Sequence, residues 1–213
     1  QGGYLQMVVS KDKGQTWSRP RLIRRNEDPR VTYQVANGMQ TLSNGDILMP
    51  ITYCRVPKVK DPKTGKEKYD TGHADYRREV TLLRSKDNGQ TWTLEKHPEF
   101  PQPWFQFGRL VETDDIRLFM PGDGWFLVSR DFGKTWEPKV SMGVPVECET
   151  NIFRAADKSF VAIIRQQHGL GPRRQFITTW SKSTKRWAPY RFIPVQGKMP
   201  DVLVLPSERV LLA

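Results

Sequence analysis

Short runs in which apolar and polar residues alternate recur along the chain and predict β-strands. Three of them, YLQMVV before Ser10, REVTLLR before Ser85 and WFLV before Ser129, lead into polar segments rich in turn-forming residues. Alternation with a period of two places one face of a strand in a core, because successive side chains point to opposite faces. The pattern predicts an all-β fold built from hairpins.

The polar segment after each run has the pattern Ser-x-Asp-x-Gly-x-Thr-Trp. Gly tolerates a positive φ and Asp accepts hydrogen bonds from nearby backbone amides, so both suit the reversal of a hairpin. We therefore expect each copy to be a turn with its Trp packed beneath it. A degenerate copy, SKSTKRW at 181–187, has Ser183 in place of the Asp. The structural positions of the full copies are Ser10, Asp12, Gly14 and Trp17, then Ser85, Asp87, Gly89 and Trp92, then Ser129, Asp131, Gly133 and Trp136.

A second repeat interleaves with the first, and each copy is a strand, a short polar turn and another strand. The copies begin at residues 38, 108, 151 and 201, and Asn44-Gly45 is the strongest turn signal among them. One unit then has four strands, and the spacings of 70, 43 and 50 residues resemble those of β-propeller blades. We expect one partial propeller domain over 1–213, with blades at about 1–20, 34–94, 104–138, 149–189 and 199–213.

The ends and the composition of the sequence indicate a globular piece of a longer chain. The sequence starts without Met and stops inside an apolar run, so we interpret it as a piece truncated at both ends. Seven Trp and 37% hydrophobic residues indicate a globular chain. No run reaches the roughly 20 apolar residues of a membrane span, and no signal peptide is visible. Cys54, Cys148 and three His give no disulfide or zinc pattern, so we expect structural thiols, no metal and no cofactor.

The net charge of +11 and the pI near 9.8 indicate a surface that attracts anions. Nucleic acid, acidic sugars and anionic membranes all satisfy that condition. No RNP, zinc-finger or helix-turn-helix pattern is present, which makes nucleic acid an unlikely partner.

The strand order separates two faces of the predicted sheets. Consecutive antiparallel strands place alternate turns on opposite sides, so the Asn44-Gly45 turn and the Ser-x-Asp-x-Gly-x-Thr-Trp turns share one face. The connections between the second and third strands lie on the other face, and one of them is long, because 41 residues separate Asn44 from Ser85. Its excess, 54–78, is either a solvated hairpin tip or part of a binding site. The candidate binding residues in it are His73, Asp75, Arg77 and Arg78.

Glu149 and Arg165 stand 16 residues apart, at the start and end of one predicted hairpin whose turn is Asp157-Lys158. Both should therefore meet on the face that carries the long connection. Two interpretations stay open: a functional pair, or an exposed ion pair at the rim worth about 0–1 kcal/mol. The equivalent positions of the other hairpins are Ala36 with Thr52 and Gln106 with Gly122, so the fold does not require charges there. Glu147 is an alternative to Glu149, and Arg173 and Arg174 could add positive potential.

The repeated motif resembles the Asp box, or BNR repeat, of the sialidase superfamily. The resemblance implies a six-bladed β-propeller, present here as an incomplete set of about four blades. It also implies that the boxes join the third and fourth strands and that substrate binds on the opposite face. The segment ECETNIFRAADKSFVAIIR is similar to a family Glu followed one hairpin later by an Arg. By this resemblance Glu149 is the base that activates a Tyr nucleophile, and Arg165 binds the substrate carboxylate.

The resemblance further implies a retaining exo-α-sialidase-like glycoside hydrolase. Its substrate would be a sialylated or other acidic glycan, and its location would be secreted, periplasmic or lysosomal. The family's acid/base Asp, its Tyr nucleophile and its other two Arg have no counterpart within 1–213, so we expect these residues alone to be inactive. Similar boxes occur in propellers that are not sialidases, and a non-catalytic propeller that binds glycan or protein is the alternative. The sequence does not predict an oligomeric state.

Overall fold

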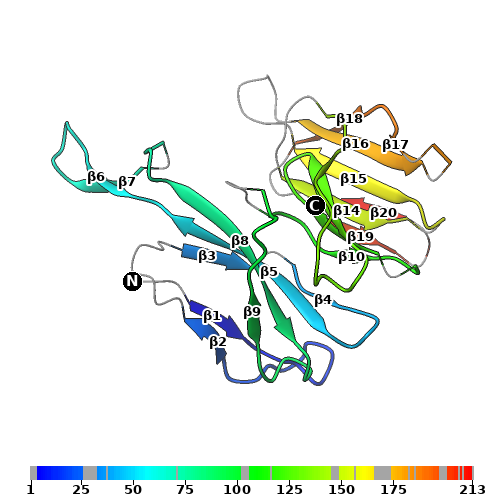
Figure 1. Ribbon diagram of the computed structural model, residues 1–213, viewed down its shortest axis with the longest axis horizontal. Helices are drawn as coiled ribbons and strands as arrows, with labels where there is room; N and C mark the ends of the chain where they lie inside the picture. The colour runs from blue at the N-terminus through cyan, green and yellow to red at the C-terminus, as the bar shows by residue number, and fades with distance from the viewer. Residues whose placement is uncertain are drawn as a thin grey trace.

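The described strands form a succession of antiparallel sheets (Figure 1). The computed structural model describes residues 4–25, 33–36, 38–70, 72–101, 106–115, 117–144, 149–155, 157–165, 174–181, 183–184, 186–196, 201–205, 207 and 209–212. Every helix or strand assigned within these ranges is a β-strand, which confirms the all-β prediction for this part of the chain. No helix among these residues is long and apolar enough to cross a membrane.

The second sheet shows how one repeat is built. Its first strand is divided into β3 (Tyr33–Ala36) and β4 (Gln40–Thr41), and both parts pair with β5 (Ile47–Arg55). β5 pairs in turn with β8 (Arg77–Ser85), which pairs with β9 (Thr93–Glu95). The seven central residues of β5 are all buried, because neighbouring sheets cover both of its faces. Strict alternation of apolar and polar residues is therefore absent from this strand.

The other sheets repeat this order. The third sheet contains β10 (Val111–Glu112), β11 (Leu118–Pro121), β12 (Trp125–Ser129) and β13 (Val140–Ser141). The fourth contains β14 (Thr150–Arg154), β15 (Phe160–Arg165) and β16 (Arg174–Ser181), with β17 (Arg186–Trp187) and β18 (Arg191–Gln196) both paired to β16. Three separate hairpins are β1 (Tyr4–Met7) with β2 (Arg21–Arg25), β6 (Lys58–Lys60) with β7 (Glu67–Tyr69), and β19 (Val202–Val204) with β20 (Val210–Leu212).

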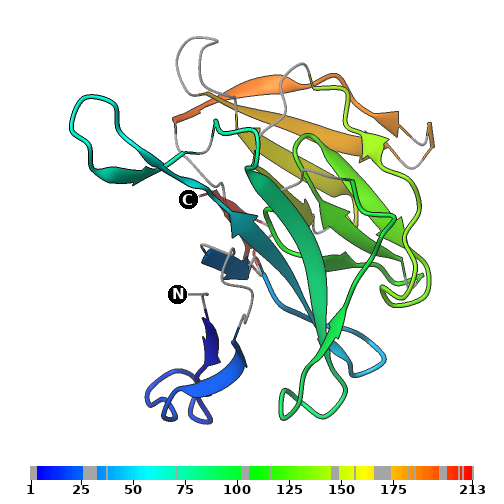
Figure 2. The same ribbon diagram turned by 60° about the vertical axis from the view of Figure 1, so that its left-hand side comes forward.

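Apolar side chains between successive sheets form the core. Leu48 and Leu82 of the second sheet pack in one cluster with Met120 of the third. Phe119 of the third sheet packs in the next cluster with Ile164 of the fourth. Burying a large apolar side chain stabilises a fold by about 1.5–3 kcal/mol, so these interfaces join the sheets into one body (Figure 2).

The first strands of neighbouring sheets approach each other at the residues where the second sequence repeat begins. A Cβ on Gly38 would lie 3.0 Å from the Cα of Arg109, and a Cβ on Gly108 would lie 2.5 Å from the carbonyl oxygen of Thr150. Asn151 Nδ2 donates a hydrogen bond of 3.1 Å to Asp201 Oδ1. The recurrence at 38, 108, 151 and 201 therefore marks one structural position in four successive sheets.

Each Asp box is a hydrogen-bonded turn between two adjacent strands. In the second copy, Ser85 Oγ donates to Asp87 Oδ1 at 2.8 Å and accepts from the amide of Gly89 at 2.8 Å, while the amide and the hydroxyl of Thr91 donate to the Asp87 carboxylate. The same bonds occur in the copies centred on Asp12 and Asp131. Two successive residues adopt a positive φ, Asn88 at 56° and Gly89 at 81°, so the turn demands the left-handed region at the residue before the Gly as well.

The three box tryptophans differ in burial. Trp136 is 7% exposed and belongs to the core between the second and third sheets, and Trp92 is half-buried, whereas Trp17 is 62% exposed. Trp17 packs beneath its own turn as expected, with its Cζ2 3.8 Å from a Cβ placed on Gly14, although most of its side chain is exposed. The second and third boxes rest on the sheet before them, since a Cβ on Gly133 would lie 2.8 Å from Leu48. No sheet precedes the first box within the described residues.

The degenerate fourth copy keeps part of this turn without a carboxylate. The hydroxyls of Ser181 and Ser183 lie 3.1 Å apart, and the amide of Thr184 donates to Ser181 Oγ at 3.3 Å. The Trp remains, and the rings of Trp187 and Trp180 meet edge to face with centroids 5.6 Å apart. A serine pair can therefore occupy the place of the Ser–Asp pair when aromatic packing supports the turn.

We expect Asp87→Asn to lower the Tm at pH 7 and to have progressively less effect at low pH. Hydrogen bonds from the side chain and amide of Thr91 and from Ser85 lower the pKa of Asp87 from 3.8 to about 2. Because the folded state favours the ionised form, this stabilisation is present above about pH 4 and is lost as the pH falls through about 2. Thermal melts of both proteins between pH 7 and pH 2 check this, and a Tm difference that stays constant throughout would contradict it. Thr91→Val, which removes one donor, should show part of the effect.

A buried arginine of the second sheet lies next to the third Asp box. Arg84 Nε and Nη2 donate to the two carboxylate oxygens of Glu95 at 2.7 and 3.0 Å, and Nη1 donates to Asp46 at 2.9 Å. Burial lowers the pKa of Arg84, but the hydrogen bonds and negative charges of Glu95 and Asp46 outweigh it and raise the pKa above its ordinary value. The side chain is 3% exposed and lies next to Gly133.

We expect Arg84→Ala to destabilise the fold by about 3–5 kcal/mol, because it leaves two partly buried carboxylates without their counter-charge. Urea denaturation measures the change. Arg130→Ala is the matched control, since the ion pair of Arg130 with Glu137 is exposed and should contribute only about 0–1 kcal/mol. Equal losses for the two variants would show that the Arg84 network does not stabilise the sheets.

Candidate active site

Glu149 and Arg165 lie side by side at the end of the β14–β15 hairpin. The amide of Arg165 donates to the carbonyl oxygen of Glu149 at 2.9 Å, which continues the ladder in which Thr150 pairs with Ile164. The side chains form an ion pair between Arg165 Nε and Glu149 Oε2. The tight turn at 157–158, with Lys158 at a φ of 66°, sets this register and brings the two residues together.

The pair is largely buried, since the side chain of Arg165 is 9% exposed and that of Glu149 is 12% exposed. The pair is therefore not exposed, and the choice between a functional pair and an ion pair that only ties β14 to β15 stays a prediction. Taking two charges out of water carries a desolvation cost, and removing one partner of such a pair leaves an uncompensated buried charge. A buried Glu–Arg pair that only one of the aligned hairpins carries is a candidate for chemistry.

Other buried polar side chains accompany the pair at the same ends of the strands. Thr150 Oγ1 accepts from the amide of Gly124 at 3.0 Å, and Thr52 Oγ1 accepts from the amide of Gln106 at 3.3 Å. Gln175 lies directly opposite Arg165 in the β15–β16 ladder and is 1% exposed. Gln175 is not among the residues singled out from the sequence. It is the one amide side chain in the strand RQFITTW, which was the feature that could have pointed to it.

This end of the sheets is opposite to the Asp boxes. β15 runs toward Arg165 and β16 runs away from it to the degenerate box at 181–187, so the Glu149–Arg165 pair and the box occupy the two ends of the fourth sheet. The second sheet has the same arrangement, with the β6–β7 hairpin at one end and the turn between β8 and β9 at the other (Figures 1 and 2). The carboxylates of the boxes are thus remote from the pair.

Two equivalences assumed from the sequence differ from the observed ladders, the first by one residue and the second by two. Ala36 pairs with Ile51 rather than with Thr52, because the ladder shifts by one between β3 and β4, where Gly38 has a φ of 75°. The β10–β11 ladder, in which Val111 pairs with Phe119, places Gly122 opposite Gly108 rather than opposite Gln106 when it is continued. Neither shift affects the β14–β15 hairpin.

The predicted loop residues do not bond to the Glu149–Arg165 pair. His73 Nδ1 lies 3.6 Å from Asp75 Oδ2, and both residues belong to the exposed connection before β8. Arg77 donates to the carbonyl oxygens of Ala74 and Tyr76, and the Arg78 guanidinium lies over the Tyr76 ring at 5.6 Å. Their roles toward a substrate remain predictions.

The other charged and cysteine residues singled out in the sequence are Glu147, Cys148, Arg173, Arg174 and Cys54. The first three lie outside the described residues. Arg174 is exposed, with its guanidinium 5.3 Å from the Phe192 ring, and Cys54 is buried. Among the described side chains, no group of three or more His, Cys, Asp or Glu could hold a metal ion.

Comparisons with known proteins agree with this architecture. The chain has the repeats of an Asp-box protein, and the model of the BNR/Asp-box repeat matches residues 127–138, which contain the third box. A curated sialidase of Paraclostridium sordellii is 26% identical over 174 residues, covering 72% of this chain and 39% of that protein. The chain thus spans about two fifths of the length of this relative.

Solved structures share the fold. A protein of unknown function from Dyadobacter fermentans is similar with a TM-score of 0.77 at 23% identity, over 98% of this chain and 63% of that one. The NanB sialidase of Streptococcus pneumoniae is similar with a TM-score of 0.63 at 14% identity, over 89% of this chain and 47% of that one. The repeat match and the curated relative support a relationship to the sialidase superfamily, and the solved sialidase shares the fold.

Proposed function

We propose that the chain is part of a sialidase-like exo-glycosidase that hydrolyses terminal sialic acid or a related acidic sugar from glycans. The observation that carries the proposal is the buried Glu149–Arg165 pair at the end of the sheets opposite the Asp boxes. A detectable relationship to a curated sialidase supports the same activity class.

In the proposed site, Arg165 binds the carboxylate of the sugar. A guanidinium has five donors in a planar fork, and the bond from Nε to Glu149 orients that plane. Arg binds a carboxylate with two parallel hydrogen bonds, which fixes the orientation of the sugar ring as well as its charge.

Glu149 is proposed to activate a tyrosine nucleophile in a retaining mechanism. A charged Asp or Glu nucleophile would be repelled by the carboxylate of the sugar, whereas a tyrosine is neutral until a base takes its proton. The ion pair with Arg165 fixes the position of the Glu149 carboxylate.

We further propose that the described sheets belong to a six-bladed propeller. Successive sheets approach one another through their first strands at the four repeat positions, as blades do around a common axis. The fold similarity to the NanB sialidase supports this arrangement.

The proposed activity is tested with a fluorogenic α-sialoside and the full-length protein, with and without Glu149→Gln, because residues 1–213 alone are expected to be inactive. We expect hydrolysis by the wild type and a kcat lowered by about 100-fold or more in the variant, since a positioned base contributes roughly that much. Glu147→Gln is the matched control. If Glu149→Gln keeps full activity and Glu147→Gln loses it, the base is Glu147 and the assignment to Glu149 is wrong.

A non-catalytic Asp-box protein that binds glycan or protein is the second candidate, because the matched repeat is a turn at the end of the sheets opposite the Glu149–Arg165 pair and does not by itself imply catalysis. Saturable binding of the sialoside without any release of the fluorophore would favour it.

A further inference from the structure

A cavity of about 620 Å³ lies beside the second sheet, at the same end as the β6–β7 hairpin. Its walls come from the end of β5, the start of β8 and the segment that follows β9. A volume of this size is within the range of small-molecule sites in proteins, roughly 300–1,000 Å³. It is large enough for one sugar ring with its substituents.

The charged side chains that line this cavity are predominantly cationic. Arg55, Arg77, Arg78 and Lys96 face a single lining carboxylate, that of Glu79. Arg55 and Arg77 are direct partners in the β5–β8 ladder, and like charges directly opposite each other destabilise a sheet. Glu79 Oε2 lies 3.9 Å from Arg55 Nη2, so the single lining carboxylate is already paired with Arg55. An anion bound between these strands would offset the remaining positive charge of Arg77, Arg78 and Lys96.

The cavity differs from the box end of the same sheet, where the buried cation Arg84 is matched by two carboxylates. Arg78 has no ion pair with any described residue, and its Nε is buried without a hydrogen-bond partner among the described atoms. His97, which lines the cavity with its side chain 6% exposed, likewise has no partner for Nε2 in the described part of the chain. The cavity thus contains polar groups, the Arg78 Nε donor among them, that have no partner in the described part of the protein.

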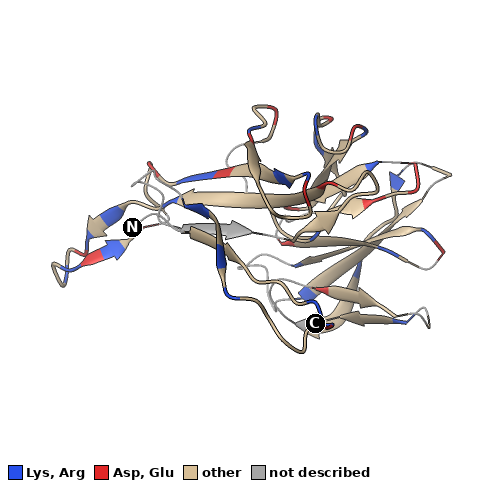
Figure 3. Cartoon of the chain, turned by 90° about the horizontal axis from the view of Figure 1, so that it is seen from below, with Lys and Arg blue, Asp and Glu red and all other residues tan. Residues whose placement is uncertain are grey.

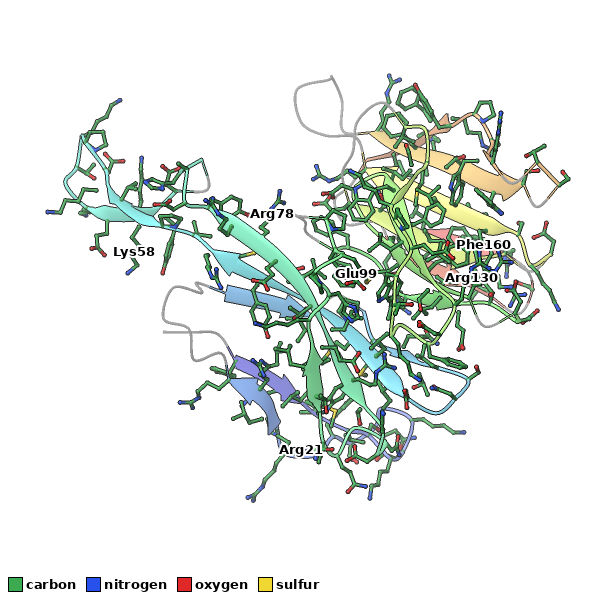
Figure 4. All side chains as sticks on the ribbon, in the orientation of Figure 1. Arg21, Lys58, Arg78, Glu99, Arg130 and Phe160 are labelled. Atoms are coloured by element: carbon green, nitrogen blue, oxygen red, sulfur yellow. The ribbon has the colours of Figure 1, made fainter. Side chains whose placement is uncertain are left out.

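The hairpin next to the cavity extends the positive surface. β6 and β7 project from the body of the molecule, with Lys58 on the projecting part and Arg78 at its base (Figure 4). Five Lys and two acidic residues occupy 58–69, and two of these Lys pair with Glu67 and Asp61. Figure 3 shows these charges on the projecting hairpin. The excess of positive charge therefore continues from the cavity along the hairpin.

We propose that this cavity binds a second anionic group of an acidic glycan, a carboxylate or a sulfate, apart from the sugar held by Arg165. Arg78 and Lys96 are the residues that bind it, and Arg55 and Arg77 supply the surrounding positive potential. The ligand is then a glycan with more than one acidic sugar. The identity of the first sugar rests on the proposed function, while the anion site rests on the cavity itself.

The test compares two trisaccharides of equal length by calorimetric titration: a trimer of sialic acid, with three carboxylates, and sialyllactose, with one. Glu149→Gln is present throughout to prevent hydrolysis. We expect the trimer to bind at least about tenfold more tightly than sialyllactose. Arg78→Ala should bring the trimer to the level of sialyllactose and leave sialyllactose unchanged, and Arg130→Ala at the box end should change neither.

The outcomes separate the two proposals. A trimer preference that survives Arg78→Ala, or an equal loss for both ligands in that variant, overturns the second anion site. Indifference of sialyllactose binding to Arg165→Ala overturns the proposed function instead. A preference that disappears in 0.5 M salt in the Glu149→Gln protein but does not respond to the added Arg78→Ala reflects bulk charge alone and also overturns the anion site.

Discussion

Arg165→Ala is expected to weaken the binding of a carboxylated sugar by about 30-fold or more, while a neutral sugar of the same shape loses less than about threefold. The physical reason is that Arg165 is the cation at the end of the β14–β15 hairpin, held in place by Glu149 and by the backbone bond between the two residues. Titration of the protein with sialic acid and with its methyl ester measures the difference, because the ester lacks only the charge.

Arg165→Lys serves as the control for this prediction. It keeps the charge but loses the planar fork, so an intermediate affinity is expected. Thermal melts of both variants establish that they remain folded, which matters because Arg165→Ala leaves Glu149 as a buried charge. Equal losses for sialic acid and its ester in Arg165→Ala would contradict a carboxylate-binding role.

Gly108→Ala is expected to destabilise the fold by roughly 2–5 kcal/mol. Gly108 has a φ of 77°, and the new Cβ would lie 2.5 Å from the carbonyl oxygen of Thr150 and 3.0 Å from the Cα of Asn151. The left-handed conformation costs Ala about 1–2 kcal/mol, and the overlap with a neighbouring backbone adds about 1–3 kcal/mol. Urea denaturation of the two proteins measures the loss.

Gly45→Ala separates the two contributions. Gly45 has a φ of 88° but no atom within 4 Å of its added Cβ, so only the conformational cost of about 1–2 kcal/mol should appear. If both variants lose the same free energy of unfolding, the close approach of the third and fourth sheets at Gly108 is not as described.

Features that depend on local sequence could be predicted. The Asp box places its donors and acceptors within seven residues of one another, from Ser85 to Trp92. The turn at Asn44-Gly45 is specified by those two residues alone. The approach of Glu149 to Arg165 was predictable for the same reason, since one tight turn fixes the register of both strands. Each of these predictions required only the geometry of a single hairpin.

Features that depend on packing between sheets could not be predicted. Whether Trp17, Trp92 or Trp136 is buried depends on the sheet that precedes its box, and the three boxes have nearly the same sequence. The one-residue shift in the second sheet arises between β3 and β4, where pairing to β5 is interrupted. The cavity at Arg78 requires Lys96 and His97 to come beside the start of β8, and no local pattern specifies that contact.

The central claim is that the site lies at Glu149 and Arg165, at the end of the sheets opposite the Asp boxes. A crystal structure of the protein with bound sialic acid tests it most directly. The account predicts that the carboxylate of the sugar lies about 3 Å from the guanidinium nitrogens of Arg165. A sugar bound at the Asp-box end, with no contact to Arg165, would contradict it.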